Sequence, residues 1–76
     1  MGYERSVHGH VLKVSAEDDG GNHWRGRVEI FDRNGKYVWT LQTLARHPSE
    51  RAATSIAEGL GEAYARLQLD RQSQSD

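Results

Sequence analysis

The segment that decides the fold is WRGRVEIFDRNGKYVWTLQTLA, residues 24–45. Asn34-Gly35 in its middle is typical of a two-residue β-hairpin turn, because a type I′ turn needs a positive φ at both central positions. Side chains alternate along a strand, so this turn places the large apolar residues on one face of the hairpin. The pairs predicted on that face are Ile30 with Trp39, Val28 with Leu41, and Trp24 with Ala45.

A further strand is expected before this hairpin, at about residues 7–16. Its Leu12, Val14 and Ala16 would join the same apolar face. Residues 18–22, with the sequence Asp-Asp-Gly-Gly-Asn, are of the types that favour turns and would connect this strand to the next. The sequence therefore predicts a three-stranded antiparallel meander in the order 1-2-3, with the first and third strands at its edges.

An amphipathic helix is expected after the sheet. Pro48 and Glu50 are typical of a helix start, since proline is tolerated in the first turn and an acid there suits the helix dipole. Gly59 and Gly61 lie inside the helix, and we expect them where it approaches a tryptophan closely. Apolar residues recur at three- and four-residue steps and are expected to face the sheet. They are Ala53, Ile56, Ala57, Leu60, Ala63, Tyr64 and Leu67.

Together these elements predict an α+β fold of β-β-β-α order, with one C-terminal helix packed on one face of the sheet. We expect a single domain over residues 1–69. The segment 70–76 has few apolar side chains to bury, so a disordered tail is expected there.

Length and composition limit the class of protein. The chain has 76 residues, enough for one small domain, and it has no cysteine, so its core has to come from packing. The lack of cysteine, of a long apolar run and of a secretory signal predicts a cytoplasmic protein. A net charge of −1 argues against indiscriminate nucleic-acid binding, although arginines gather in the middle of the chain.

The sheet face opposite the helix is expected to be uncovered. Apolar and basic side chains would be interleaved on it, with Phe31 directly opposite Val38, while both tryptophans would face the helix. The candidate interaction residues are Val11, Lys13, Arg25, Arg27, Phe31, Val38, Leu44 and Arg46. Three interpretations remain open: a merely solvated face, an interface with a protein partner or a second copy, and a platform for RNA or single-stranded DNA.

Histidines carry the remaining chemical possibilities. His8 and His10 would leave the same face of one strand, and His23 and His47 would come close in the expected register. A zinc site needs further ligands, which the sequence does not place. Since there is no cysteine, and the serines lack a Gly-x-Ser-x-Gly setting, no nucleophile is indicated. We therefore expect no catalytic residue, no metal site and no cofactor.

An acidic-glycine turn at residues 17–21, Trp24 at the start of a strand, and Ser49-Glu50 at a helix start leading to Glu62-Ala63-Tyr64 form a recognisable order. This order resembles small bacterial proteins of β-β-β-α layout, and among them HicB-type antitoxins, whose fold is a partial double-stranded-RNA-binding domain. The chain has residues 32–35, Asp-Arg-Asn-Gly, where those antitoxins carry a proline- and glycine-rich segment. It also lacks their usual fourth strand and their appended DNA-binding region. The resemblance therefore implies topology and assigns no functional residue.

The function predicted from the sequence is that of a small non-enzymatic bacterial interaction module. It would bind a protein partner, or itself, through the open sheet face and the sheet edges. The alternative is a nucleic-acid-binding module that uses Lys13, Arg25, Arg27 and Arg46.

Overall fold

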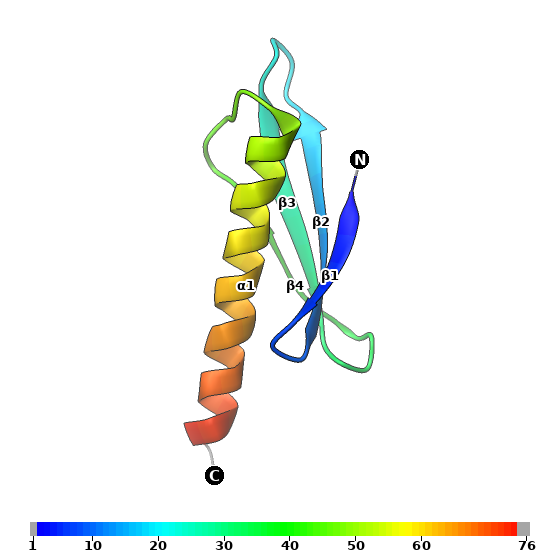
Figure 1. Ribbon diagram of the computed structural model, residues 1–76, viewed down its shortest axis with the longest axis vertical. Coiled ribbons are helices and arrows are strands. Elements are labelled where there is room, and N and C mark those ends of the chain that lie inside the picture. Colours follow the sequence, from blue (N-terminus) through cyan, green and yellow to red (C-terminus); the bar gives the residue numbers. More distant parts are fainter. Residues whose placement is uncertain (1, 75–76) are drawn as a thin grey trace.

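The computed structural model describes residues 2–74 and shows an antiparallel sheet covered on one face by a single helix (Figure 1). The sheet has four strands in the order β1-β2-β3-β4, so the α+β class is confirmed and the expected count of three strands is wrong. Residues 75–76 of the expected tail lie outside the described residues. The elements are β1 (Tyr3–Val7), β2 (His10–Asp18), β3 (Trp24–Phe31), β4 (Tyr37–Gln42) and α1 (Glu50–Gln74).

A tight turn at His8-Gly9 produces the additional strand. Both residues have a positive φ, 49° and 76°, and Val7 pairs with His10 across the turn. These are the backbone requirements of a two-residue hairpin, here met by a histidine followed by glycine. The expected strand over residues 7–16 therefore begins in a turn, and its N-terminal neighbour β1 folds back along it. His8 and His10 consequently do not share a strand face.

The second hairpin has the expected register in its centre and a different turn. Ile30 pairs with Trp39 as predicted, but Phe31 pairs with Tyr37 and not with Val38. Asp32 is the cause, because its carboxylate accepts hydrogen bonds from the backbone N–H groups of residues 34 and 36, each at 2.9 Å. Only Gly35 has a positive φ in this loop, so the two-residue turn is replaced by a longer loop and a shift in register.

Beyond β4, the chain stays attached to β3 through Thr43. The buried hydroxyl of Thr43 accepts a hydrogen bond from the N–H of Gly26 at 2.9 Å, and the N–H of Thr43 donates to the carbonyl of Gly26 at 2.9 Å. The chain then bulges outward before Trp24 pairs with His47, each accepting a backbone hydrogen bond of 2.8 Å from the other. The expected pairing of Trp24 with Ala45 is therefore wrong, since Trp24 pairs with His47, two residues further along the chain.

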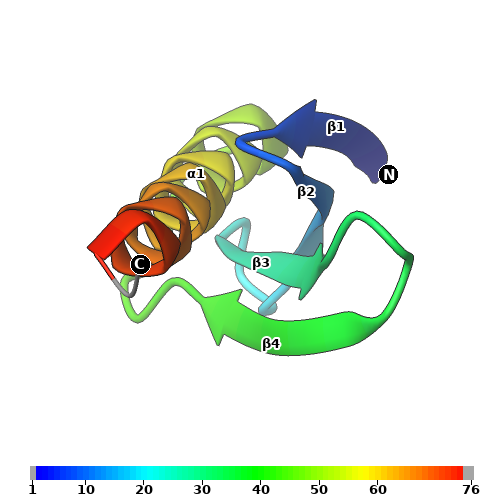
Figure 2. The ribbon, with the colours of Figure 1, turned by 90° about the horizontal axis from the view of Figure 1, so that it is seen from below.

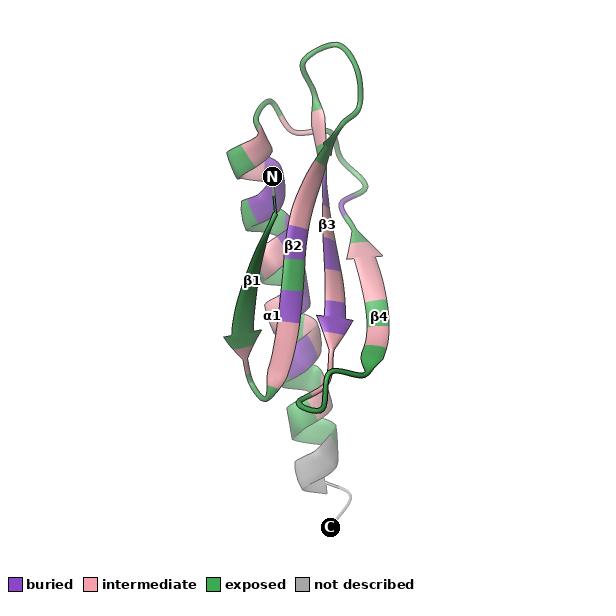
Figure 3. Ribbon diagram, turned by 90° about the vertical axis from the view of Figure 1, so that its right-hand side faces the viewer, coloured by how far each residue is buried: buried purple, intermediate pink, exposed green. Residues whose placement is uncertain are grey.

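Small residues of α1 form the contact between the helix and the sheet. Four large side chains of β2 and β3 are fully buried, namely Leu12, Val14, Val28 and Ile30 (Figure 3). Against them lie Ala53, Ala57 and Ala65 of the helix, which are also fully buried. At Gly26, an added Cβ would come within 2.9 Å of the carbonyl carbon of Ala53 and the Cβ of Ala57. The helix therefore approaches β3 to backbone contact, which only glycine permits.

Gly61 also lies at a close approach, whereas Gly59 faces open space. An added Cβ at Gly61 would lie 2.8 Å from Val28 and 3.2 Å from Leu12, so the residues that crowd it are aliphatic and not the expected tryptophans. The start of α1 is as expected, with the Ser49 hydroxyl accepting a hydrogen bond from the N–H of Ala52 at 3.0 Å. The helix continues past residue 69, where the sequence analysis ended the domain.

The large apolar residues of α1 do not face the sheet. Ile56, Leu60 and Leu67 are exposed, although the sequence analysis placed them in the stripe that contacts the sheet. Ala53 and Ala57 of that stripe are buried as expected, and Tyr64 packs against the core. The contact face is thus rotated from the expected one, and the helix keeps its largest apolar side chains outside the core.

A polar contact fixes the other flank of the helix to β1. The hydroxyl of Tyr3 donates to Glu58 Oε1 at 2.6 Å, and Arg5 pairs with Oε2 of the same carboxylate. The hydrogen bond from Tyr3, together with Arg5, holds the pKa of Glu58 below its ordinary value of 4.5 against the opposing effect of burial. Burial raises the pKa of Tyr3 above 10.0, and Glu58 adds to this increase.

We predict opposite effects for two glycine-to-alanine substitutions. Gly26→Ala should destabilise the protein by more than about 2 kcal/mol, because the new Cβ meets helix backbone that has to move. Gly59→Ala, the matched control, should stabilise it by up to about 1 kcal/mol through helix propensity, since no atom crowds the site. Urea denaturation measures both, and equal effects of the two substitutions would contradict the close approach at β3.

We also predict that the contribution of Glu58 depends on pH. Because the pKa of Glu58 is lower in the folded state, its carboxylate stabilises the fold above the ordinary pKa and loses this effect as the pH falls through the folded value. Glu58→Gln should therefore cost about 1 kcal/mol at neutral pH. The gap to the parent protein should close as the pH falls from about 7 to about 3. Glu62→Gln should show a smaller gap, since Glu62 lies 3.7 Å from Arg5 and has no bond to Tyr3. A gap for Glu58→Gln that is the same at both pH values would exclude this role.

Candidate interaction surface

Large apolar side chains gather on the β4 side of the molecule without cover. Trp39 of β4 is 55% exposed, and on α1 Ile56, Leu60 and Leu67 are 50%, 40% and 62% exposed. We call these four residues the apolar surface. Trp39 pairs with Ile30, which is fully buried, so its side chain lies on the helix side of the sheet but beyond the helix.

The position of α1 explains why this surface is uncovered. The helix packs on β2 and β3 and hardly touches β4 (Figure 2). With 3.6 residues per turn, Ile56, Leu60 and Leu67 lie on the flank of α1 opposite to Glu58. Since Glu58 is held by β1, and β1 and β4 are opposite edges of the sheet, the apolar flank is the one turned toward β4.

The helix and strand portions of this surface lie at the same level along the sheet. Gly61 lies against Val28, and Val28 pairs with Leu41 of β4. Leu60 is therefore level with Leu41, which is half-buried and packs against the core between the helix and the rest of β4. Trp39 follows two residues earlier on the same strand face. These residues form an apolar strip that leads from the flank of the helix toward the edge of the sheet.

The edge itself has backbone groups available for pairing. Within residues 2–74, β4 has a neighbour on one side only. Thr43 directs its N–H to β3, and backbone groups alternate along a strand, so Thr40 and Gln42 direct theirs away from β3. The sequence of β4, YVWTLQ, has no charged residue and no proline. Such residues are what usually protects an exposed edge from pairing with another strand.

The opposite edge, β1, is of a different kind. It carries Glu4 and Arg5 within its five residues, and Arg5 is engaged by Glu58 of the helix. Charged side chains on an edge strand oppose the docking of another strand. The two edges of the sheet therefore differ, and β4 is the one suited to association.

Of the residues expected on the open sheet face, the structure brings five together. Val11, Lys13, Arg25, Arg27 and Phe31 share the outer face by their pairing between β2 and β3. The other three lie elsewhere. Val38 packs against the core, while Leu44, which is 95% exposed, and Arg46 lie in the loop between β4 and α1. Tyr37, which sequence reasoning missed, joins Phe31 in an edge-to-face ring contact with centroids 5.9 Å apart. The register shift at Asp32 brings Tyr37 there.

The basic side chains of this face all have acidic partners. Lys13 additionally lies over the ring of Phe31, 4.9 Å from its centroid. On the outer face of β1, β2 and β3 the charges balance, with Glu4, Glu17 and Glu29 against Lys13, Arg25 and Arg27. The ion pairs are Lys13 with Glu4 (3.8 Å), Arg27 with Glu17 (3.9 Å), Arg25 with Asp19 (3.4 Å) and Arg46 with Asp19 (2.6 Å). The face therefore does not present the surplus positive charge that attracts a phosphate backbone.

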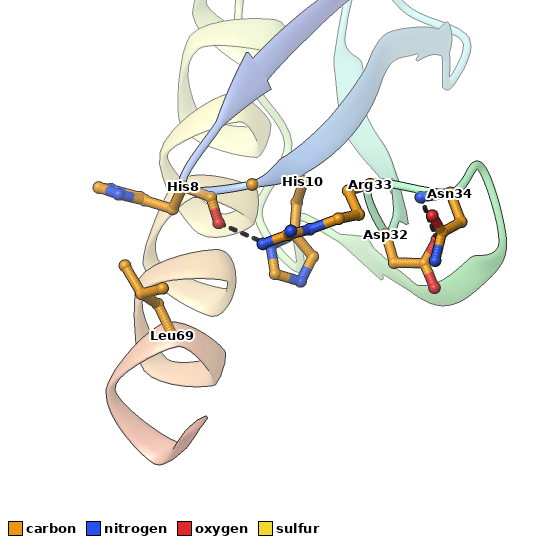
Figure 4. Close-up of a pocket in the computed structure, with 7 residues that line it drawn as sticks. His8, His10, Asp32, Arg33, Asn34 and Leu69 are labelled. Carbon is orange, nitrogen blue, oxygen red and sulfur yellow. Dashed lines mark hydrogen bonds between the residues drawn. The ribbon is translucent and has the colours of Figure 1, made fainter. Parts of the chain in front are cut away.

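A second feature is an open pocket of about 580 Å³ at the end of the sheet (Figure 4). It lies between the two hairpin turns and Leu69 of α1, with His8, His10 and Arg33 in its wall. The rings of His8 and His10 point in different directions, and His10 Nδ1 lies 3.0 Å from the carbonyl of His8. Among the described residues, no three His, Asp or Glu side chains are grouped so that they could hold a metal ion. His23 and His47, which were expected to come close, do not belong to such a group either.

We predict that the outer sheet face does not bind short RNA or single-stranded DNA in a saturable way at low salt, because the basic side chains of this face are paired with acidic ones. Asp19→Asn should create weak, salt-sensitive binding, since it releases both Arg25 and Arg46. Fluorescence anisotropy with labelled oligonucleotides at two salt concentrations measures this. Tight binding by the unmodified protein that weakens steeply with salt would favour the nucleic-acid alternative.

Within residues 2–74, the helix has no stretch apolar enough to cross a membrane. Comparison of the chain with models of protein families, with curated proteins and with solved structures found no match. The resemblance to HicB-type antitoxins thus stays a prediction about topology, and the function has to be argued from the surfaces described above.

Proposed function

We propose that the protein is a non-enzymatic interaction module that binds another protein through the apolar surface of Trp39, Ile56, Leu60 and Leu67 and the adjoining edge of β4. One observation carries this proposal. Trp39 is on the same side of the sheet as the fully buried Ile30, yet it is 55% exposed. A core-type side chain is therefore left uncovered beside a strand that has unused backbone groups.

From the sequence, binding is expected through the outer sheet face and the edges. The position of the exposed apolar side chains favours the edge. On the outer face, Val11 and Phe31 are half-buried among paired charges, whereas the four large side chains of the apolar surface are exposed. Apolar patches of this kind are typical of protein–protein contacts.

The energetics indicate what the partner has to supply. Full burial of a large apolar side chain is worth about 1.5–3 kcal/mol, so covering four half-exposed side chains gives about 4 kcal/mol. Association costs about 4–15 kcal/mol of lost freedom. Burial of the apolar surface therefore only offsets the lowest cost, and a stable complex also needs hydrogen bonds along β4. The partner we propose has both an apolar contact face and a strand.

A purification experiment with matched variants tests this proposal. We expect a partner to co-purify with the tagged protein from its own organism, and to be lost with the double variant Trp39→Lys, Leu60→Lys. The control is Ser6→Lys, Ser55→Lys, which adds the same charge to exposed positions on β1 and on the solvent side of α1. Mass spectrometry identifies the co-purified proteins, and circular dichroism checks that both variants are folded. Identical sets of proteins with both variants, with the untagged chain of the organism counted among the co-purified proteins, would contradict the proposed surface.

A further inference from the structure

We infer that the apolar surface is occupied by a second copy of this chain, in a two-fold symmetric dimer in which β4 pairs antiparallel with β4 of the second copy. This inference rests on the proposed function and names the partner. The two four-stranded sheets would join into one continuous sheet. A two-fold axis perpendicular to the sheet keeps both helices on the same side, so the two apolar surfaces face each other.

The backbone geometry of β4 suits this pairing. Thr40 and Gln42 direct their backbone groups outward, and a strand that pairs with its own copy needs such residues near the axis. An axis at Thr40 makes Thr40 and its copy a hydrogen-bonded pair. Trp39 then lies opposite Leu41 of the second copy, on the helix side of the sheet. Aromatic and aliphatic residues in opposed positions are favourable cross-strand pairs.

Charge favours a second copy over a charged partner. In a two-fold interface every residue near the axis meets its own copy, so a charged residue there would face a like charge. The strip from β4 to α1 contains no such residue, since β4 is uncharged and Ala63 is the residue between Leu60 and Leu67 on this flank of the helix. The β1 edge is different, because a two-fold axis there would bring Glu4 and Arg5 close to their own copies.

The spacing of the elements also fits. Neighbouring strands lie about 4.8 Å apart, and α1 lies over β2 and β3, so the axes of the two helices would be about 19 Å apart. Helices in direct contact have axes about 8–10 Å apart. The remaining space lies above the paired β4 strands. Trp39 and Leu41 of the two copies project into it, between the flanks that carry Ile56, Leu60 and Leu67. The exposed tryptophans would thus form the centre of the dimer.

Sedimentation velocity over about 1–200 µM tests the dimer, a range that covers weak and moderate self-association. We expect the mass of a dimer for the unmodified protein and for Ser6→Lys, which is on the other edge. Trp39→Lys should raise the dissociation constant at least about 30-fold, because it places two like charges at the centre of the interface. Circular dichroism has to show that Trp39→Lys is folded. A monomer at all concentrations for the unmodified protein would overturn the inference.

A cysteine substitution tests which edge pairs. The sequence contains no cysteine. A single introduced thiol can therefore form a disulfide only with the same thiol of a second copy. Hydrogen-bonded antiparallel pairs have Cα atoms about 5.5 Å apart, within the range of a disulfide. Under mild oxidation, Thr40→Cys should therefore form a covalent dimer in high yield, and Ser6→Cys on β1 should not. A dimer that cross-links through Ser6→Cys and not through Thr40→Cys would overturn the assignment to β4.

The two proposals can fail separately. If the unmodified protein is a monomer at all concentrations, the dimer is excluded. The co-purification experiment then decides whether the same surface binds a different protein. If the double variant Trp39→Lys, Leu60→Lys also loses nothing in that experiment, the proposed function fails as well.

Discussion

The structure depends on the contact between α1 and β3 at Gly26. There the helix backbone at Ala53 lies directly on the strand, with no side chain between them. Ala57 and Gly61 continue this contact along the helix, and Gly61 receives Val28 and Leu12 of the sheet. Small residues on one side and branched aliphatic residues on the other thus form a thin, well-filled layer. A helix seated this closely has little freedom to shift across the sheet.

The position of α1 on the sheet also determines which side chains remain outside the core. A single helix covers a width of about 10 Å, which corresponds to roughly two strands, and this sheet has four. Tyr3, Arg5 and Glu58 connect one flank of the helix with β1 through polar contacts, so the exposed apolar side chains lie on the side of β4. The asymmetry of the molecule, with a polar contact at one edge and apolar side chains at the other, follows from these two contacts. Both the proposed function and the dimer use the second edge.

Much of the fold could be predicted from the sequence, because apolar and polar residues alternate along the strands and clear turn residues separate them. The pairing of Ile30 with Trp39 needed only a turn near Asn34-Gly35 and the alternation of side chains. The exact turn could not be predicted, since the Asp32 carboxylate competes with the intrinsic preference of Asn-Gly. The first hairpin was missed because few residues other than glycine adopt a positive φ, and His8-Gly9 is not among the dipeptides, such as Asn-Gly and Asp-Gly, that strongly indicate a two-residue turn.

The candidate surface was harder to predict. Along α1 two sets of positions are apolar, one of alanines and one that includes Ile56, Leu60 and Leu67, and periodicity alone favours the larger side chains for the core. The outcome was decided by the glycine at position 26, whose role is visible only when the helix and the strand are in contact. The basic residues could be named from the sequence, but not their partners. Asp19 meets Arg25 and Arg46 only because the turn after β2 and the loop before α1 lie side by side.

That shared carboxylate has a consequence for the motions of the molecule. Asp19 belongs to the turn between β2 and β3, whereas Arg46 belongs to the loop that leads into the helix. Trp24 and His47 add two backbone hydrogen bonds between the same segments. Opening of either segment breaks the bonds that hold the other, so the two should open together as one cooperative unit. We therefore expect local unfolding at this end of the sheet to separate the N-terminal end of α1 from the sheet at the same time.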